Sequence, residues 1–397
     1  MAKILFAWEL GLGFGHLSPY LELVRRLNKE KHKVYFAARD AGNAEKVFGK
    51  EGITILQAPF NPRGIDNPIR MARTHAHLLH NIGFNDPVLL TGRIKAWQEV
   101  YKYVKPDLVI YDHSPTAQLA MRHTKCKDVL CGTGFTVPPG KVPMPNMRFW
   151  EKNVDQNKLL EQEKMIIDTV NRAMRGLKLP ELVNVKQLME VDATLLMSFK
   201  ELDHYNDRGP AEYVGIPLTK DYGEPPQWPA AGKFKVFAYL YPFKTLGSLL
   251  DTLKKADISA LIYAPEVQRA LKEKHKHPKL LFANNPVRMS EATQQCDLAV
   301  TNGTHGTTVA LLLAGKPLLA CPQNLERLLV GQRVNQMGAG LVAPQLKPEG
   351  MHAKFNALIA DPKYRQNAQA FARKYADFSL EKHLDLIMGH LDRALAS

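Results

Sequence analysis

The chain has 397 residues, 45% hydrophobic and 23% charged, a balance that excludes disorder as its main state and allows two domains with separate cores. Its formal net charge of +14 at pH 7 favours an anionic partner, such as a nucleotide sugar, an acidic lipid surface or nucleic acid. Nucleic acid is excluded, because the basic residues are dispersed and no nucleic-acid-binding module is recognisable.

The N-terminus and the cysteines indicate a cytoplasmic protein. The first residues lack the apolar segment and cleavage site of a secretion signal, and no apolar run approaches the roughly 20 residues that span a bilayer. The cysteines lie in apolar, strand-like segments without the spacing of metal ligands, and we expect them to be buried thiols in a reducing compartment. They are Cys126, Cys131, Cys296 and Cys321.

Short apolar runs alternate with helical patterns in the first half of the chain, which is typical of a parallel sheet with crossover helices. A helix is expected over residues 19–29, because Ser18 suits the N-cap and Pro19 suits the first helical position. This half therefore predicts a doubly wound sheet. The expected strands are residues 3–8, 33–38, 53–58, 107–112, 129–133 and 193–198.

The second half repeats this pattern after a segment rich in Pro and Gly at residues 210–232, which is the best candidate for a linker. Its expected strands are residues 235–240, 259–264, 279–283, 298–302 and 317–321, followed by helices from about residue 351. We predict an α/β protein with two Rossmann-like, doubly wound domains, 1–215 and 216–375, that face each other across a cleft.

The loop after the first strand reads GLGFGH at residues 11–16. Its glycines are spaced by two and His16 takes the place of the last glycine of the G-x-G-x-x-G fingerprint, which argues against a dinucleotide site. The glycines allow a tight turn that leaves His16 beside the start of a helix. His16 is either a general base, if a carboxylate orients it, or a plain helix-start residue.

Asp112 is the candidate carboxylate, because it ends a strand at the sheet edge where the loop of His16 also lies. Its alternative role is to cap the next helix, although Ser114 can serve there instead. His113 is interpreted as a supporting residue. Glu9 ends the first strand near the same edge and is expected to be an acceptor contact or a second carboxylate.

A second loop, within residues 301–322, joins a strand to a helix and is the better phosphate cradle. Its backbone amides and hydroxyl groups can bind an anion at the helix start. The residues in question are Gly303, Thr304, His305, Gly306, Thr307 and Thr308.

These features resemble the GT-B-fold glycosyltransferases of the UDP-glycosyltransferase (family 1) type, related to bacterial antibiotic and macrolide glycosyltransferases. The likeness lies in GFGHLSPYLELVRRL at 13–27, PDLVIYD at 106–112 and residues 302–341. It implies an inverting, metal-independent hexosyl transfer that needs no cofactor besides its co-substrate, a nucleoside-diphosphate sugar. In that family the residues matching His16 and Asp112 are the general base and its orienting partner.

The resemblance also assigns the domains and the binding residues. Domain 1–215 would bind the acceptor, domain 216–375 the donor, and a helix at 376–397 would pack back on the first domain. Acceptor-binding residues would be Glu9, Phe14, Gly15, His80 and Phe135. An apolar, basic rim over residues 60–100 and 134–180 suits a small-molecule or lipid-linked acceptor and a peripheral membrane contact.

The donor loop departs from the family pattern H-G-G-x-G-T, because Asn302 replaces the histidine and Thr304 the second glycine. Asn302 can still donate to a phosphate, and Ala310 stands where a glutamate would hold the ribose. Glu326 keeps a carboxylate for the sugar, whereas Arg327 adds a cation for a phosphate or an acidic sugar. The nucleotide and the sugar therefore stay open.

Three histidines in HAHLLH, at positions 75, 77 and 80, are a candidate metal cluster. No carboxylate or cysteine stands beside them at ligand spacing, so we favour a role in lining the pocket or a position on the protein surface. Two alternatives to a transferase remain. One is a GT-B-like sugar-nucleotide-binding or regulatory protein without transfer activity, and the other is a sugar-nucleotide epimerase.

Overall fold

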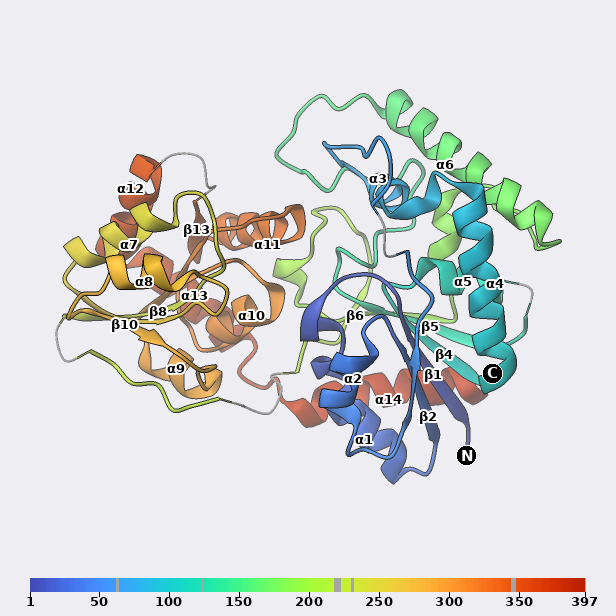
Figure 1. Ribbon diagram of the computed structural model, residues 1–397, viewed down its shortest axis with the longest axis horizontal. Helices are drawn as coiled ribbons and strands as arrows, with labels where there is room; N and C mark the ends of the chain where they lie inside the picture. The colour runs from blue at the N-terminus through green and yellow to red at the C-terminus, as the bar shows by residue number, and fades with distance from the viewer. Residues whose placement is uncertain (62–63, 123, 218–222, 230–231, 344–347, 397) are drawn as a thin grey trace. The chain divides into compact units, whose positions relative to one another are not determined.

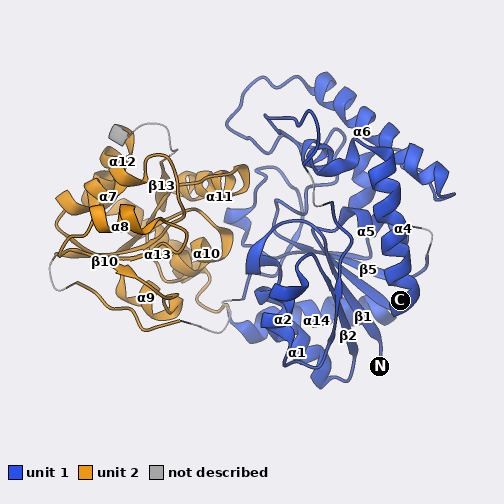
Figure 2. Ribbon diagram, in the orientation of Figure 1, with its two compact units in different colours: residues 1–217, 379–397 blue, residues 218–378 orange. Residues whose placement is uncertain are grey.

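The computed structural model describes residues 1–61, 64–122, 124–217, 223–229, 232–343 and 348–396. The chain divides into two compact units, residues 1–217 with 379–397 and residues 218–378 (Figure 2). The expected linker at 210–232 includes residues 218–222 and 230–231, which lie outside the described part.

The first unit is built on a seven-stranded parallel sheet with the order β3-β2-β1-β4-β5-β6-β7 (Figure 1). Its strands are β1 (Lys3–Trp8), β2 (Lys33–Ala38), β3 (Thr54–Gln57), β4 (Leu108–Asp112), β5 (Lys127–Gly132), β6 (Ala193–Leu196) and β7 (Glu212–Tyr213). The strand order reverses between β1 and β4, and ligands of doubly wound sheets bind beyond the carboxyl ends of the strands at such a point.

Helices cover both faces of this sheet. They are α1 (Leu21–Lys29), α2 (Ala41–Phe48), α3 (His75–Leu79), α4 (Pro87–Val104), α5 (Pro115–Met121), α6 (Gln156–Gly176) and α14 (Leu380–Ala396). Alternate residues of β1 point to opposite faces, so that Leu5 packs in the core with α4, α5 and α6, and Phe6 in the core with α1, α2 and α14. The C-terminal helix α14 thus belongs to the first unit.

The segment before α1 differs from its prediction, because the helix begins at Leu21 rather than at residue 19. Short 3-10 turns, η1 (Gly13–His16) and η2 (Ser18–Tyr20), precede it, and the side chain of Ser18 caps nothing. The amides of Leu17 and Tyr20 bond to carbonyls three residues back, at 3.0 Å in each case. The glycine loop therefore continues as tight turns up to Tyr20.

The second unit has a six-stranded parallel sheet with the order β10-β9-β8-β11-β12-β13. Its strands are β8 (Phe234–Tyr239), β9 (Ile258–Tyr263), β10 (Leu280–Ala283), β11 (Leu298–Thr301), β12 (Leu318–Ala320) and β13 (Gly340–Val342). Its helices are α7 (Leu246–Lys255), α8 (Arg269–Lys274), α9 (Met289–Gln295), α10 (His305–Leu313), α11 (Leu325–Gln336), α12 (Pro348–Ala360) and α13 (Lys363–Lys374). The strand order reverses between β8 and β11, as it does in the first sheet.

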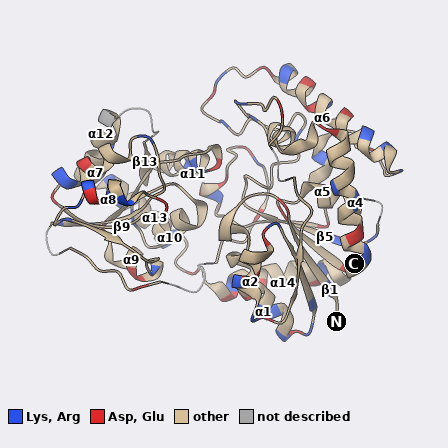
Figure 3. Ribbon diagram, viewed as in Figure 1, with Lys and Arg blue, Asp and Glu red and all other residues tan. Residues whose placement is uncertain are grey.

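Three remaining observations concern charge distribution, the cysteines and membrane-spanning helices. Lys and Arg are scattered over both units among Asp and Glu (Figure 3). All four cysteines are free thiols; Cys126 is partly exposed, and the rest are buried as predicted. Among the described residues, no helix has both the length and the apolar character that crossing a bilayer requires.

Candidate functional site

His16 and Asp112 meet at the carboxyl edge of the first sheet. Trp8 and Asp112 are register partners on β1 and β4, which brings the loop after β1 over the end of β4. Nδ1 of His16 lies 3.0 Å from Oδ2 of Asp112, and their side chains are 19% and 9% exposed. The ring of Trp8 stacks on His16 with a centroid separation of 5.3 Å. The predicted contact is therefore present, and the imidazole is held on two sides.

Two of the loop's three glycines have a conformational reason. Gly11 has φ +93°, and a Cβ there would lie 2.2 Å from Nε2 of His16. Gly13 has φ +76°, a conformation that side chains rarely adopt. Gly15 has neither a positive φ nor an atom near its missing Cβ. Gly11 therefore makes room for the His16 ring.

The pair has the chemistry of an oriented base. A carboxylate only accepts hydrogen bonds, so the Nδ1–H of His16 donates a hydrogen bond to Asp112, and in the neutral ring Nε2 carries the lone pair. Tyr20 lies beneath, and its burial, reinforced by the charge of Asp112, raises the pKa of its phenol well above the usual value. Tyr20 therefore stays protonated and does not compete as a base.

Further rings surround this pair. The sequence argument gave His113 and His75 no direct role, whereas it predicted Phe135 as an acceptor contact. His113 is partly exposed, and its ring centroid lies 6.3 Å from that of His16. His75 is buried behind it at 6.0 Å, and Phe135 meets it edge-on at 6.4 Å. Burial lowers the pKa of His75 to about 4, so its ring is neutral at pH 7.

The other predicted acceptor residues have different positions. Phe14 and Gly15 are exposed on η1 beside His16, and Phe135 adjoins His113. His80 begins the π-helical turn η3 (His80–Phe84), with Nε2 3.4 Å from the carbonyl oxygen of Asn67. Phe14 and Gly15 thus lie beside His16, and Phe135 lies beside His113.

The prediction that Glu9 is an acceptor contact or a second carboxylate is wrong. Its side chain is fully buried and accepts from the Thr116 amide at 2.7 Å and from Nε1 of Trp97 at 2.8 Å. Burial raises its pKa, and the charge of Arg93 opposes that rise. Because both carboxylate oxygens are engaged within the protein, Glu9 joins β1 to α4 and α5 as a structural residue.

The HAHLLH cluster is likewise structural. His77 is buried, accepts at Nδ1 from the Arg73 amide at 3.1 Å, and has Nε2 3.0 Å from Gln162. The sequence argument favoured either pocket lining or the protein surface for these histidines. Because His75 and His77 are buried, a surface position is excluded for both. Within the described residues, no group of three or more His, Cys, Asp or Glu side chains could hold a metal ion.

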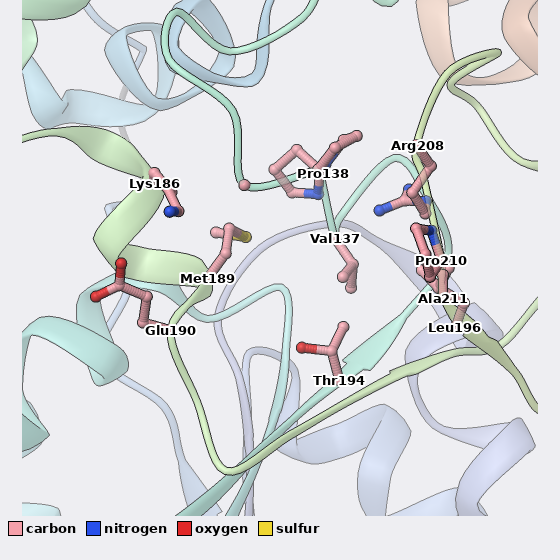
Figure 4. A pocket seen from close by; sticks show the side chains of 12 residues that line it. Val137, Pro138, Lys186, Met189, Glu190, Thr194, Leu196, Arg208, Pro210 and Ala211 are labelled. Carbon is pink, nitrogen blue, oxygen red and sulfur yellow. The ribbon is translucent and has the colours of Figure 1, made fainter.

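A cavity of about 300 Å³ lies in the first unit, lined by residues other than the predicted acceptor contacts. Figure 4 shows Lys186 and Arg208 on opposite sides of it. Arg208 is fixed by the buried Asp203, to which its Nη2 donates at 2.9 Å, and Tyr213 donates to the same carboxylate at 2.6 Å. Arg208 is thus primarily a partner for a buried charge.

The loop after β11 presents buried polar atoms at the start of α10. Asn302 and Thr308 are fully buried, and Asn302 Nδ2, Thr304 Oγ1 and Thr308 Oγ1 have no hydrogen-bond partner among the described residues. Oδ1 of Asn302 accepts from the Thr304 amide at 3.1 Å, which fixes the amide group of its side chain. Buried polar groups are nearly always paired, so these atoms are candidates for contact with a ligand.

The rest of the loop is arranged for close backbone packing. Gly303 has φ +81°, and a Cβ there would lie 2.9 Å from the carbonyl oxygen of Arg327. His305 is buried on the first turn of α10, whereas Gly306 is exposed and Thr307 partly exposed. Gly303 thus brings the start of α11 against the loop.

Aromatic residues that the sequence argument missed adjoin this loop. Tyr239 ends β8, its carbonyl oxygen accepts from the Asn302 amide at 3.2 Å, and its hydroxyl lies 3.0 Å from that of Tyr241. The guanidinium of Arg327 lies 5.1 Å from the Tyr241 ring centroid and donates to Gln323 at 2.7 Å. Glu326 precedes it in the first turn of α11. The tyrosines could have been noticed as aromatic residues at a strand end.

Comparisons with known proteins agree with this architecture. Residues 248–378 match the family model "Erythromycin biosynthesis protein CIII-like, C-terminal domain". The chain is 22% identical to NDP-glycosyltransferase YjiC of Bacillus subtilis (strain 168) over 370 residues, covering 84% of this chain and 82% of that protein.

Solved structures extend the likeness over the whole chain. The glycotransferase of kitacinnamycin matches with a TM-score of 0.72 and 17% identity, over 98% of this chain and 99% of that chain. The spinosyn rhamnosyltransferase SpnG matches with a TM-score of 0.71 and 16% identity, over 99% and 100%. SpnG complexed with spinosyn aglycone and SpnG complexed with thymidine diphosphate also match. The predicted fold class, two Rossmann-like halves of the GT-B type, is confirmed.

Proposed function

We propose that this chain is a GT-B glycosyltransferase of the family 1 type, and that it transfers a sugar from a nucleoside-diphosphate donor to an acceptor hydroxyl with inversion. His16 is the general base and Asp112 orients it. The observation that carries this assignment is the 3.0 Å contact between Nδ1 of His16 and Asp112, in a position of the ring that Gly11 permits because it has no Cβ. This arrangement fixes the tautomer that a base needs.

The reaction follows from these roles. Nε2 of His16 takes the proton of the acceptor hydroxyl, and the oxygen forms a bond to the anomeric carbon as the bond from that carbon to the diphosphate oxygen breaks. A single displacement of this kind inverts the anomeric centre. Asp112 stabilises the imidazolium that forms, as a buried carboxylate does in a catalytic triad.

The donor diphosphate is assigned to the loop after β11. Asn302 Nδ2 and the hydroxyls of Thr304 and Thr308 can donate to phosphate oxygens at the start of α10, where the helix dipole also favours negative charge. Arg327 supplies a further cation. SpnG complexed with thymidine diphosphate makes a thymidine or uridine diphosphate the first donor nucleotide to test.

The acceptor is assigned to the region around His16. Leu12 is 80% exposed and Phe14 is 41% exposed, so this edge offers apolar surface to a small molecule with an apolar body. Lipid-linked acceptors share that chemistry, and peripheral contact with a membrane would follow from such an acceptor. A cytoplasmic location and a reaction without metal or cofactor are part of the same proposal.

His16→Ala tests the assignment. Transfer should fall by about 10²- to 10⁴-fold, because the general base is lost, while stabilisation by nucleoside diphosphate stays as in the wild type. Both are measured on one preparation, by product formation and by thermal unfolding with uridine or thymidine diphosphate. Unchanged turnover in the variant would exclude His16 as the base.

A binding protein without transfer activity is the second candidate, favoured by Ala310, which offers no acceptor for ribose hydroxyls from α10. It predicts that the wild type is stabilised by nucleoside diphosphates and transfers no sugar to any acceptor. Thermal unfolding combined with a donor-hydrolysis and transfer assay separates the two candidates.

A further inference from the structure

His113 follows β4 directly and has a left-handed backbone conformation, with φ +47°. This conformation is uncommon for a residue other than glycine, and it often marks a functional constraint. The His113 carbonyl oxygen accepts from the amide of Leu10 at 3.2 Å, so the turn ties the end of β4 to the loop of His16.

The His113 ring stands beside the proposed base. Its plane is inclined by 30° to that of His16, with 6.3 Å between the centroids. Phe135 closes one edge of the ring, and the buried ring of His75 supports it. His16, His113 and Phe135 are all partly exposed. His113 is therefore fixed by its neighbours while part of it reaches solvent.

Charge is kept off this ring. Burial lowers the pKa of His113 well below its usual value, and the nearby His75, His16 and Arg39 lower it further. At pH 7 the imidazole is neutral, so one ring nitrogen donates a hydrogen bond and the other accepts one. Such a ring can bind either a hydroxyl or a carbonyl oxygen of a substrate.

We infer that His113 is an acceptor-binding residue, and that the acceptor carries a second oxygen on the carbon next to the one that bears the reacting hydroxyl. The inference rests on the proposed function of His16. The two imidazoles are inclined by 30° with 6.3 Å between their centroids, a separation at which each ring can bind its own one of two adjacent oxygens. Vicinal diols, catechols and hydroxyl groups beside a carbonyl supply two oxygens at such points.

The two rings then have separate tasks. Nε2 of His16 removes the proton from the reacting hydroxyl, whose oxygen attacks the anomeric carbon. His113 holds the second oxygen and exchanges no proton with the substrate overall. Because a site built to hydrogen-bond an oxygen discriminates against an analogue that lacks it, His113 determines which acceptors are used.

A matched pair of acceptors tests this inference, namely 2,3-dihydroxynaphthalene and 2-naphthol, which differ by the second hydroxyl alone. Equilibrium titration by naphthol fluorescence should show the diol bound about three- to tenfold more tightly by the wild type, as expected for one hydrogen bond. His113→Asn and His113→Gly should remove this preference and leave the affinity for 2-naphthol within about twofold.

The variants are chosen so that folding does not obscure the result. Asn and Gly both accept a positive φ, so the turn at position 113 is preserved, and thermal unfolding checks this. His352→Asn, at an exposed position on α12, is the control and should keep the preference.

Two outcomes would overturn the inference. The first is that the wild type binds the two naphthols equally well or binds neither of them. The second is that both variants at position 113 keep the preference for the diol over 2-naphthol. Either result leaves the proposed function standing if transfer still depends on His16. Loss of the proposed function would instead appear as transfer that is indifferent to His16→Ala.

Discussion

The loop after β1 and the loop after β11 each lie beside the point where the strand order of their own sheet reverses, on opposite sides of that point, and they are built for different tasks. The first loop continues through 3-10 turns and presents one imidazole against Asp112. The second loop passes directly into α10 and buries polar groups whose hydrogen bonds the described residues do not complete.

The difference lies in what each positive-φ glycine faces. A Cβ at Gly11 would meet the ring of His16, so that glycine makes room for a side chain. A Cβ at Gly303 would meet the backbone of Arg327, so that glycine lets two backbone segments approach. A shared glycine pattern therefore indicates a tight turn without saying what the turn accommodates. The first and last of the predictions below act on these two loops, and the second acts on the buried His75 behind the first loop.

Gly11→Ala should have the largest effect. The new Cβ would lie 2.2 Å from Nε2 of His16, so the base must move, and the φ of +93° adds strain. We expect transfer to fall by about 10²- to 10³-fold, because small displacements of a catalytic group cost that much. Steady-state kinetics measure the loss, and nucleotide stabilisation measured by thermal unfolding should be unchanged.

Gly92→Ala is the matched control for this substitution. Gly92 lies on α4 with no atom near its missing Cβ, so alanine fits there and activity should be kept. Full activity of Gly11→Ala would show that His16 tolerates displacement, and it would remove the distinction drawn between the two loops.

His75→Phe should make the first unit less sensitive to acid. The native ring stays neutral down to about pH 4, whereas in the unfolded chain it gains a proton near pH 6.5, so acid favours unfolding over that interval. This residue should therefore lower the free energy of unfolding of the wild type by up to about 3 kcal/mol between pH 6.5 and pH 4.

Urea unfolding at a series of pH values measures the effect, and the comparison of interest is the slope rather than the stability at one pH. His75→Phe should have the shallower slope, while His352→Asn, at an exposed position, should follow the wild type. Equal slopes for all three proteins would mean that His75 is protonated in the native state, contrary to its burial.

The pairing of His16 with Asp112 could be predicted because it depends on topology. Parallel strands end at one edge, and residues that follow adjacent strands meet there. The same argument placed Glu9 at this edge and failed, because its side chain turns inward to Trp97 and the Thr116 amide. Which way a strand-end side chain turns depends on helices that are distant in the sequence.

Other features depended on backbone detail that residue patterns do not carry. His113 has a positive φ, and nothing in the residue pattern predicts this conformation. Gly340 lies in β13, where a Cβ would be 2.2 Å from the Leu318 carbonyl oxygen, and the sequence argument predicted no strand there. In each case a local conformation was decided by tertiary packing.

Thr308→Val should have the smallest effect, and it tests whether the second loop is built for a ligand. Oγ1 of Thr308 is buried and has no partner among the described residues, so replacing the hydroxyl with a methyl group should leave the free energy of unfolding unchanged or raise it by up to about 1 kcal/mol. Stabilisation by uridine or thymidine diphosphate should weaken, with an affinity about five- to tenfold lower.

Thr252→Val is the control, because Oγ1 of Thr252 donates to the Ser248 carbonyl at 2.9 Å. Loss of this hydrogen bond should lower the free energy of unfolding by about 0.5 to 1 kcal/mol without changing the affinity for the nucleotide. If Thr308→Val instead loses stability as the control does and binds nucleotide normally, its hydroxyl is structural, and the contrast between the two loops rests on Asn302 and Thr304 alone.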